Sequence, residues 1–448
     1  MKTPICDFVR QYAQENTLRL HMPGHKGAGC LGVEQWDLTE IDGADVLYHA
    51  DGIIRQSQEN ASKLFGSGKT LYSAEGSSLS IRAMLYLVVL YGKQEGRTPL
   101  IAAARNAHKT FVTAAALLDV EVAWLYSRNR GSMLSCEITA EDLEQALRQM
   151  ERRPVAVYLT SPDYLGNMLD LRGISQVCHR YGVLLLVDNA HGAYLRFLPS
   201  SLHPMDLGAD LCCDSAHKTL PVLTGGAYLH ISKSAPQLFF EQGEQAMALF
   251  ASTSPSYLIL QSLDAANRYL AEGYREKLAQ AVEEICRLKA QIPIPQVGQE
   301  PLKLTIAPKV YGYLGTELGK VLQEKGIVCE FADPDFVTMM LSPEMDEGDW
   351  GRLGDALRFV EPRKALCDPV PLLPEPVRAC SLRQALFAPS RELPIGDCVG
   401  KILGAVSVTC PPAIPVLVCG ERIDEAAIAC FEYYGISHCR VLLDDIKV

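Results

Sequence analysis

The stretch Val183-Leu-Leu-Leu-Val-Asp-Asn-Ala-His-Gly192 decides the fold. Its five leading apolar residues are typical of a strand that is buried on both faces, and the polar residues after them mark the strand's end. Similar short apolar runs occur at residues 100–104, 122–126, 155–160 and 211–213. Segments with helical periodicity separate them, for example residues 137–152, for which Thr139 is the expected N-cap. This alternation predicts an α/β fold with a mainly parallel sheet.

Composition changes after this region. The charged helical pattern at residues 276–289 ends at two prolines in Gln291-Ile-Pro-Ile-Pro295. We therefore expect an N-terminal segment over 1–50, a large domain over 51–290 and a smaller α+β domain over 291–448. Within the last of these we expect strands at 303–306, 327–331 and 336–341, a helix at 314–324, and an irregular proline-rich stretch at 361–388.

The overall composition is that of an ordinary globular enzyme, with 448 residues, 48% hydrophobic and 21% charged. A formal net charge of −11 without a basic stripe argues against a nucleic-acid partner. The 15 cysteines follow no disulfide or zinc spacing, so we expect no metal and a reducing compartment. No apolar run is long enough to cross a membrane and no signal peptide is evident, so a cytoplasmic location is expected.

Two polar groups stand at the ends of expected strands. Asp188 ends the first quoted run, and Lys218 closes Ser215-Ala-His-Lys218 just after another strand. In open α/β sheets ligands bind beyond the carboxyl ends of the strands. A lysine amine and a buried carboxylate are what pyridoxal phosphate (PLP) needs, because the amine forms a Schiff base and the carboxylate keeps the pyridine nitrogen protonated. Taken singly, Asp188 is more typical of an N-cap or a buried loop carboxylate, and Lys218 of an ordinary surface lysine.

Neighbouring segments supply further candidates. Gly76-Ser77-Ser78 precedes a helical pattern at 79–91 and suits the PLP phosphate, although it could also be a plain helix cap. Ser215 and His217 could bind phosphate or a substrate carboxylate, and the apolar run 220–223 is expected to desolvate Lys218. His108, in Arg105-Asn-Ala-His-Lys109, could stack on the pyridine ring or belong to a solvated loop.

Together these blocks resemble the Orn/Lys/Arg decarboxylase family of fold-type-I PLP enzymes. The matching blocks, in chain order, are His21-Met-Pro-Gly-His-Lys-Gly27, Leu38-Thr-Glu-Ile-Asp-Gly-Ala-Asp45, residues 52–65, Arg105-Asn-Ala-His-Lys109, Asp188-Asn-Ala-His-Gly192, Ser215-Ala-His-Lys218 and Ser252-Thr-Ser-Pro-Ser-Tyr257. The chain resembles the short form, without a response-regulator-like N-terminal domain. The resemblance implies a large domain of the aspartate aminotransferase type and α-decarboxylation of arginine, lysine or ornithine in polyamine metabolism.

The resemblance also implies roles for individual residues. Lys218 would hold PLP, Asp188 would pair with the pyridinium, and His217 or Lys218 would deliver the proton. Ala190 and His108 would lie on opposite faces of the ring. The remaining implied cofactor-binding residues are Gly76, Ser77, Ser78, His191, Ser215, His217 and Thr253. Thr253 would come from the partner subunit of a homodimer whose active site lies at the interface.

Several positions depart from the family pattern. Glu75 stands where Asn is usual and Asp163 where Thr is usual, and the segments 410–415 and 419–421 are altered forms of two C-terminal blocks. An acidic residue must meet the substrate's distal cation, and the candidates are Asp163, Glu75 and Glu421. Two alternatives remain open at this point: another PLP reaction such as aminotransfer or β-elimination, or a non-catalytic binding protein with this fold.

Overall fold

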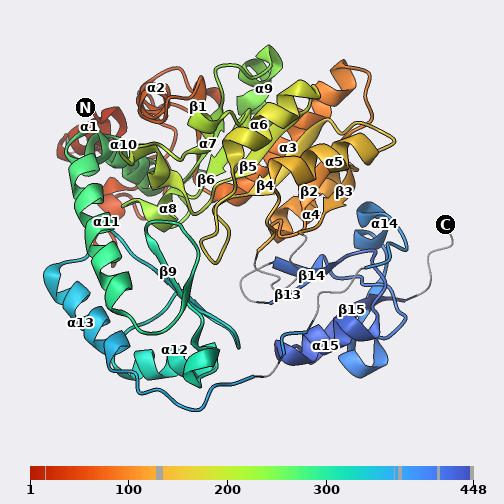
Figure 1. Cartoon of the computed structure of the whole chain (residues 1–448). Coiled ribbons are helices and arrows are strands. Elements are labelled where there is room, and N and C mark those ends of the chain that lie inside the picture. Colours follow the sequence, from red (N-terminus) through yellow and green to blue (C-terminus); the bar gives the residue numbers. More distant parts are fainter. Residues whose placement is uncertain (16, 128–134, 368, 372–375, 411–413, 444–448) are drawn as a thin grey trace. The chain divides into compact units, whose positions relative to one another are not determined.

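A computed structural model describes residues 1–15, 17–127, 135–367, 369–371, 376–410 and 414–443 (Figure 1). The chain divides into two compact units, each assembled from segments that are distant in the sequence. The first unit comprises Met1–Pro99, Val155–Val157 and Leu171–Glu276. The second comprises Leu100–Pro154, Tyr158–Asp170 and Lys277–Val448. The domain limits expected from composition stay a prediction.

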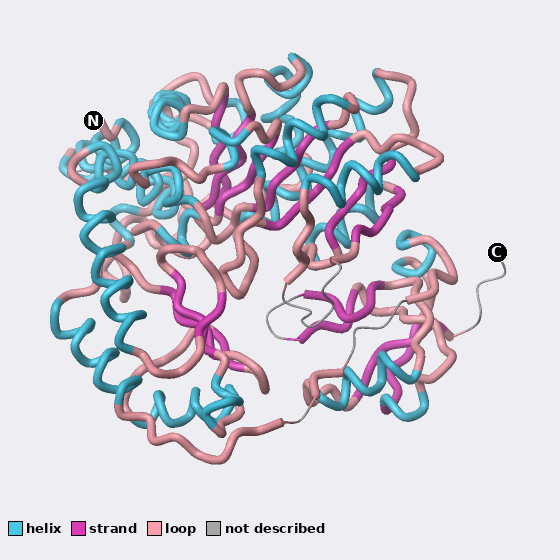
Figure 2. Tube along the Cα trace, in the orientation of Figure 1, coloured by secondary structure: helices cyan, strands magenta, loops and turns pink. Residues whose placement is uncertain are grey.

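Seven strands form one sheet in the order β1-β7-β6-β5-β4-β2-β3. Their bounds are β1 Lys69–Ser73, β2 Leu100–Ala104, β3 Glu121–Leu125, β4 Ala156–Thr160, β5 Leu184–Asp188, β6 Leu211–Asp214 and β7 Ala227–Ile231. The pairs β2–β3 and β5–β6 are parallel, whereas β7 runs antiparallel to both β6 and β1. Figure 2 shows these strands alternating with helices along the trace. The predicted α/β class and all five predicted strands are confirmed.

The helices of the first unit cover the edge and faces of its strands. They are α1 Pro4–Gln14, α2 Ile53–Phe65, α3 Ser77–Gln94, α6 Leu171–Arg180, α7 Pro204–Leu207, α8 Ala216–Thr219, α9 Gln237–Ala248 and α10 Tyr257–Ala271, with α11 Tyr274–Gln291 leading into the second unit. Helix α3 is buried at most positions from Leu79 to Gly92, as expected for a helix packed on several sides. Asp264 of α10 is buried and accepts hydrogen bonds from the Cys6 backbone N–H (3.0 Å) and the Ser57 hydroxyl (2.6 Å), which joins three helices.

The second unit contains the remaining elements. Its helices are α4 Lys109–Leu118, α5 Ala140–Gln149, α12 Gly315–Glu324, α13 Glu347–Arg358, α14 Leu382–Leu386 and α15 Glu425–Tyr433. Its further strands are β8 Gln296–Val297, β9 Lys303–Ile306, β10 Phe331–Ala332, β11 Val337–Met340, β12 Ser390–Pro394, β13 Ser407–Cys410, β14 Ile414–Val418 and β15 His438–Leu442. Strands β8–β11 form an antiparallel sheet, and β12–β15 and β13–β14 form two-stranded pairs.

The local predictions for this unit have mixed outcomes. Thr139 caps α5 in a capping box with Asp142, as the sequence predicts. The strand expected at 303–306 is β9, and the one expected at 336–341 contains β11. The strand expected at 327–331 is wrong except for its last residue, because Val328 is 85% exposed and the run forms no sheet face.

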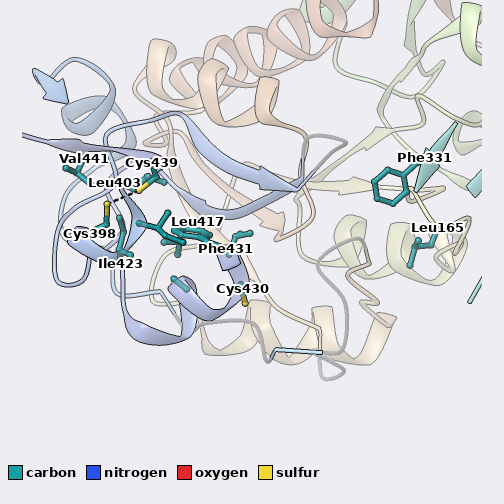
Figure 3. Packing of buried hydrophobic residues seen from close by; sticks show 13 residues of the cluster. Leu165, Phe331, Cys398, Leu403, Leu417, Ile423, Cys430, Phe431, Cys439 and Val441 are labelled. Atoms are coloured by element: carbon teal, nitrogen blue, oxygen red, sulfur yellow. Dashed lines mark hydrogen bonds between the residues drawn. The ribbon is translucent and has the colours of Figure 1, made fainter. Parts of the chain in front are cut away.

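The C-terminal part of this unit has its own apolar core (Figure 3). Buried members of this core include Leu403, Leu417 and Phe431. Cys398 and Cys439 are buried among them, with the Cys439 thiol donating to the Cys398 sulfur at 3.4 Å, so these cysteines serve as small apolar fillers. The irregular stretch expected at 361–388 includes α14; residues 368 and 372–375 of it, and 411–413 of the altered block 410–415, lie outside the described residues. Among the described helices, none is long and apolar enough to cross a membrane.

Candidate active site

Lys218 lies in the short helix α8, which directly follows β6 in the first unit. Its Nζ lies 3.2 Å from Nε2 of His191. The Lys218 side chain is exposed within the chain, and of the apolar run 220–223, Val222 is buried whereas Leu223 is 53% exposed. Leu220 is buried as well, and the expectation that this run desolvates the lysine stays a prediction.

Asp188 is the last residue of β5 and is 3% exposed. Its Oδ1 accepts hydrogen bonds from the backbone N–H of Ala190 (3.2 Å) and from the thiol of Cys213 (3.6 Å). Ala190 and His191, in the same turn, are also buried. The parallel pairing of β5 with β6 places Asp188 opposite Cys213, so the carboxylate and the lysine helix follow neighbouring strand ends.

The N-terminus of α3 carries the expected phosphate-binding hydroxyls. Ser77 and Ser78 are its first two residues, and Ser77 Oγ accepts a hydrogen bond from Ser215 Oγ at 2.8 Å. Gly76 precedes the helix with φ of 73°, a left-handed conformation that glycine adopts without strain. Its backbone N–H donates to the Gly225 carbonyl at 2.7 Å. Convergent hydroxyls at the start of an 18-residue helix form a suitable anion site.

His217 is half-buried beside this site. Its Nδ1 and its backbone N–H both meet the carbonyl oxygen of Gly226, at 3.0 Å and 3.1 Å. A carbonyl only accepts hydrogen bonds, so Nδ1 carries the proton and Nε2 keeps its lone pair in the neutral ring. Burial lowers the pKa of His217 and favours this neutral form. Nε2 is then the ring atom that can take or deliver a proton.

Gly225 supports the phosphate-binding turn, and we expect Gly225→Ala to weaken PLP binding about tenfold because strained backbone typically costs about 1–3 kcal/mol. Its φ is 100°, and a Cβ would lie 2.9 Å from the Ala74 carbonyl oxygen, so the backbone must shift away from Gly76. Absorbance titration of the apoprotein with PLP measures this. Gly96→Ala is the matched control, because Gly96 also has positive φ (67°) but open space around it. Equal PLP affinity for the two variants would contradict the expectation.

The expected roles of His108 and Thr253 stay predictions. His108 belongs to the second unit, where its ring caps α4 by accepting from the Thr110 backbone N–H at 3.2 Å. Thr253 belongs to the first unit and is exposed. The adjacent Ser252 backbone N–H donates to Glu75 Oε1 at 2.6 Å, so the loop that carries Thr253 is tied to the residue before the phosphate-binding turn.

The three acidic candidates for the substrate's distal cation differ in their partners. Glu421 forms a bidentate ion pair with Arg105, with both N–O distances 2.7 Å. Asp163 is buried, which raises its pKa, and it accepts from the backbone N–H and the amide of Asn167 at 2.8 Å and 2.9 Å. Glu75 is exposed and lies in the unit that carries the lysine. Glu421 is thus already neutralised, whereas Glu75 keeps access to solvent.

The residues of the first unit fit PLP in their chemistry. A dianionic phosphate suits the hydroxyls of Ser77 and Ser215 at a helix N-terminus. The buried carboxylate of Asp188 suits a pyridine nitrogen that must stay protonated. An ionised carboxylate has no proton to donate, so it can only accept the N–H of the pyridinium. The amine of Lys218, an exposed residue, can form a Schiff base with the aldehyde of PLP.

Sequence reasoning missed some of the supporting residues. Gly225 and Gly226 supply the carbonyls that hold Gly76 and His217, and a bare glycine pair carries no signal of these partners. Asp214, directly before Ser215, is fully buried and charged. A charged residue that ends the apolar run 211–213 was the available signal, because buried charges require partners.

Comparison with known proteins identifies the family. A family model for the major domain of Orn/Lys/Arg decarboxylases matches residues 3–299. The chain is 30% identical to an arginine decarboxylase of Bacillus subtilis over 468 residues, covering 96% of this chain and 92% of the relative. An arginine decarboxylase of Halalkalibacterium halodurans is 29% identical over 469 residues, with the same coverage of both chains.

Solved structures agree on the fold. The constitutive lysine decarboxylase of Escherichia coli matches with a TM-score of 0.78 at 17% identity, covering 98% of this chain and 82% of that one. Lysine decarboxylase A of Pseudomonas aeruginosa matches with a TM-score of 0.78 at 18% identity, covering 97% and 76%. These matches confirm the predicted fold class. The chain therefore belongs to the Orn/Lys/Arg decarboxylase family, whose enzymes use PLP to decarboxylate basic amino acids.

Proposed function

We propose that this chain is a PLP-dependent α-decarboxylase in which Lys218 binds the cofactor and Asp188 faces its pyridine nitrogen. The observation that carries the assignment is the pairing of β5 with β6, which sets the buried carboxylate and the lysine helix at neighbouring strand ends. The hydroxyl pair of Ser77 and Ser215 supports the position of the phosphate in the same unit.

Each residue then has a defined task. Bound PLP supplies an electron sink for the charge that the loss of CO₂ leaves on the substrate. The Asp188 carboxylate holds a proton on the pyridine nitrogen, and the Ala190 N–H fixes the orientation of that carboxylate. Lys218 Nζ would hold the cofactor and would be a free amine while substrate is bound. Either this amine in its protonated form, or Nε2 of His217 after it has taken up a proton, would deliver the proton to Cα.

Arginine is the first substrate that we propose. The two arginine decarboxylases named above are similar to this chain over 96% of its length. A guanidinium needs an acidic partner, and Glu75 is the candidate that combines solvent exposure with a place in the lysine-bearing unit. Lysine and ornithine are the alternative substrates of the same chemistry.

The test is a product assay on PLP-loaded protein with arginine, lysine and ornithine supplied separately. We expect release of CO₂ and the corresponding amine in equal amounts, with arginine the best substrate by kcat/KM. Formation of an α-keto acid instead would show aminotransfer. A fully PLP-loaded protein that releases no CO₂ from any of the three would refute the decarboxylase assignment.

We further propose a cytoplasmic homodimer that acts in polyamine metabolism. Buried cysteine thiols such as Cys212 and Cys213 suit a reducing compartment. The exposed position of Thr253 suits a residue that reaches the active site of a partner subunit.

A further inference from the structure

A buried cluster of polar side chains centres on Asp214, the residue directly before Ser215. Oδ2 of Asp214 meets Nε2 of His203 at 2.9 Å and Nε2 of His230 at 3.1 Å. Its Oδ1 accepts a hydrogen bond from Nδ2 of Asn189 at 2.7 Å. All four side chains are 0% exposed. Oδ1 also accepts from the thiol of Cys212 at 3.5 Å. A buried carboxylate is tolerated only when donors surround it, and here four donors converge on one side chain.

The hydrogen bonds locate the proton of His203. Its Nδ1 accepts the Met205 backbone N–H at 3.3 Å, capping α7, so its proton lies on Nε2 and is donated to Asp214. Nδ1 of His230 meets the Thr70 hydroxyl at 2.8 Å, and its Nε2 faces the same carboxylate. Burial opposes ionisation of Asp214, but electrostatic interactions and hydrogen bonds with the two histidines outweigh burial and lower the pKa of Asp214 far below its usual range.

Two histidines and an aspartate are also the composition of a metal site, and their ligand atoms lie within 4.8 Å of one another. A metal would need the Nε2 lone pair of His203, which the cap on Nδ1 converts into an N–H donor. Oδ1 of Asp214 is already used by Asn189. The cluster is therefore not a metal centre. It is a hub of hydrogen bonds in which His203, His230 and Asn189 donate to the Asp214 carboxylate.

The hub is connected to the cofactor site through Asn189, which stands between Asp188 and Ala190. A carboxylate only accepts, so Nδ2 of Asn189 must face Asp214 and Oδ1 must point away. Among the residues that the structure describes, none offers that Oδ1 a hydrogen bond, and a Cβ on Gly192 would be only 2.0 Å from it. The Asn189 amide thus fills a space that glycine leaves, and the hydrogen bond that holds it there comes from Asp214.

We propose that Asp214 is a positioning residue for the cofactor: through Asn189 it holds the Asp188–Ala190 turn in the geometry that contacts the pyridine ring. The inference rests on the proposed function, because it assigns Asp188 and Ala190 to the ring. Asp214 itself acts through its neighbours and need not touch PLP. Residues that orient a ligand-binding group in this way are often as necessary as the group they orient.

The first test is Asp214→Asn, which keeps the shape of the side chain and removes its charge. Its amide would present an N–H₂ group to a ring of donors, so the bond to Asn189 would be lost. We expect the apoprotein to bind PLP about tenfold more weakly, because a hydrogen bond to a charged group is lost. We also expect the pH midpoint of the visible absorbance band of the lysine-bound cofactor to shift, because Asp188 no longer sits correctly against the ring.

A second variant tests whether the Asn189 amide connects Asp214 to the cofactor site. Asn189→Ala removes the connecting amide while leaving the hub of Asp214 and its histidines intact, so it remains informative even if Asp214→Asn does not fold. We expect the same loss of PLP affinity and the same spectral shift. In the double variant the losses should not add, because both substitutions break one interaction. Additive losses, or unchanged affinity and spectrum in both single variants, would overturn the proposal.

The matched control is Asp264→Asn. Asp264 is as buried as Asp214 and lies in the same unit, but its partners are Cys6 and Ser57. We expect this variant to lower the melting temperature without changing the PLP dissociation constant or the pH midpoint. If the purified holoenzyme contained stoichiometric metal that Asp214→Asn lost, the cluster would be a metal site and the proposal would be wrong. If wild-type protein shows no visible band with PLP, the proposed function itself fails, whatever Asp214 does.

Discussion

Lys218→Ala should eliminate the visible absorbance band that wild-type protein acquires with PLP, and should lower decarboxylation on the order of 10³-fold or more. The amine is the group that bonds the cofactor and is one of the two proposed proton donors. Its accessible position near His191 suits both tasks. Spectra of the reconstituted proteins and CO₂ release measure the two effects.

Borohydride reduction of the wild-type holoenzyme, followed by peptide mass spectrometry, should place the reduced cofactor on Lys218. Lys233→Ala is the control, because Lys233 is exposed in the same unit and lies just beyond β7. It should keep the band and the activity. A band that persists in Lys218→Ala would mean that another lysine holds PLP, and the assignment of the site would then be wrong.

Glu421→Ala should destabilise the protein by about 3–5 kcal/mol, which is typical when one partner of a buried ion pair is removed. The side chains of Arg105 and Glu421 are 10% and 5% exposed, and the guanidinium also donates to the Val416 carbonyl at 3.2 Å. The substitution would leave the Arg105 charge buried without its carboxylate. Chemical denaturation of the variant and wild-type apoproteins measures the difference.

Two companion variants make this result specific. Replacing both residues, as Arg105→Leu with Glu421→Leu, should cost less than Glu421→Ala because no unpaired charge remains. Glu284→Ala breaks an exposed pair with Arg287 and should change stability by no more than about 1 kcal/mol. If Glu421→Ala instead leaves stability intact and raises KM for the basic amino acid, Glu421 binds substrate and its pairing with Arg105 is not its main role.

The sequence predicted the central strands well because they are short, apolar and buried on both sides. Residues 100–104 coincide with β2, 211–213 end one residue before β6 does, and 183–187 are shifted from β5 by one residue at each end. The edge strand β1 was not foreseen, because Lys69–Ser73 mixes polar and apolar residues and its pairing depends on the distant β7. Ile327 to Phe331 looked like a strand by composition alone, but composition does not report that Val328 faces solvent.

The candidate site residues show the same contrast between what local sequence pattern suggests and what tertiary contacts decide. Lys218, Asp188 and Ser77 could be proposed from the sequence because the first two stand at the ends of expected strands and Ser77 opens an expected helix. Asn189 and Asp214 were missed because their proposed role depends on one hydrogen bond between residues that are distant in the sequence. Local pattern identifies groups that act directly, whereas groups that act through others depend on tertiary contacts.

The antiparallel pairing of residues 69–73 with 227–231 has a consequence for biosynthesis. A nascent chain emerges from its N-terminus, so β1 and the serines after it leave the ribosome long before their partner strand exists. Closing so large a loop is entropically costly and slow. Ser77 and Lys218 therefore belong to one finished unit only when β7 is complete. A ligand that binds only this folded unit would then stabilise it by mass action.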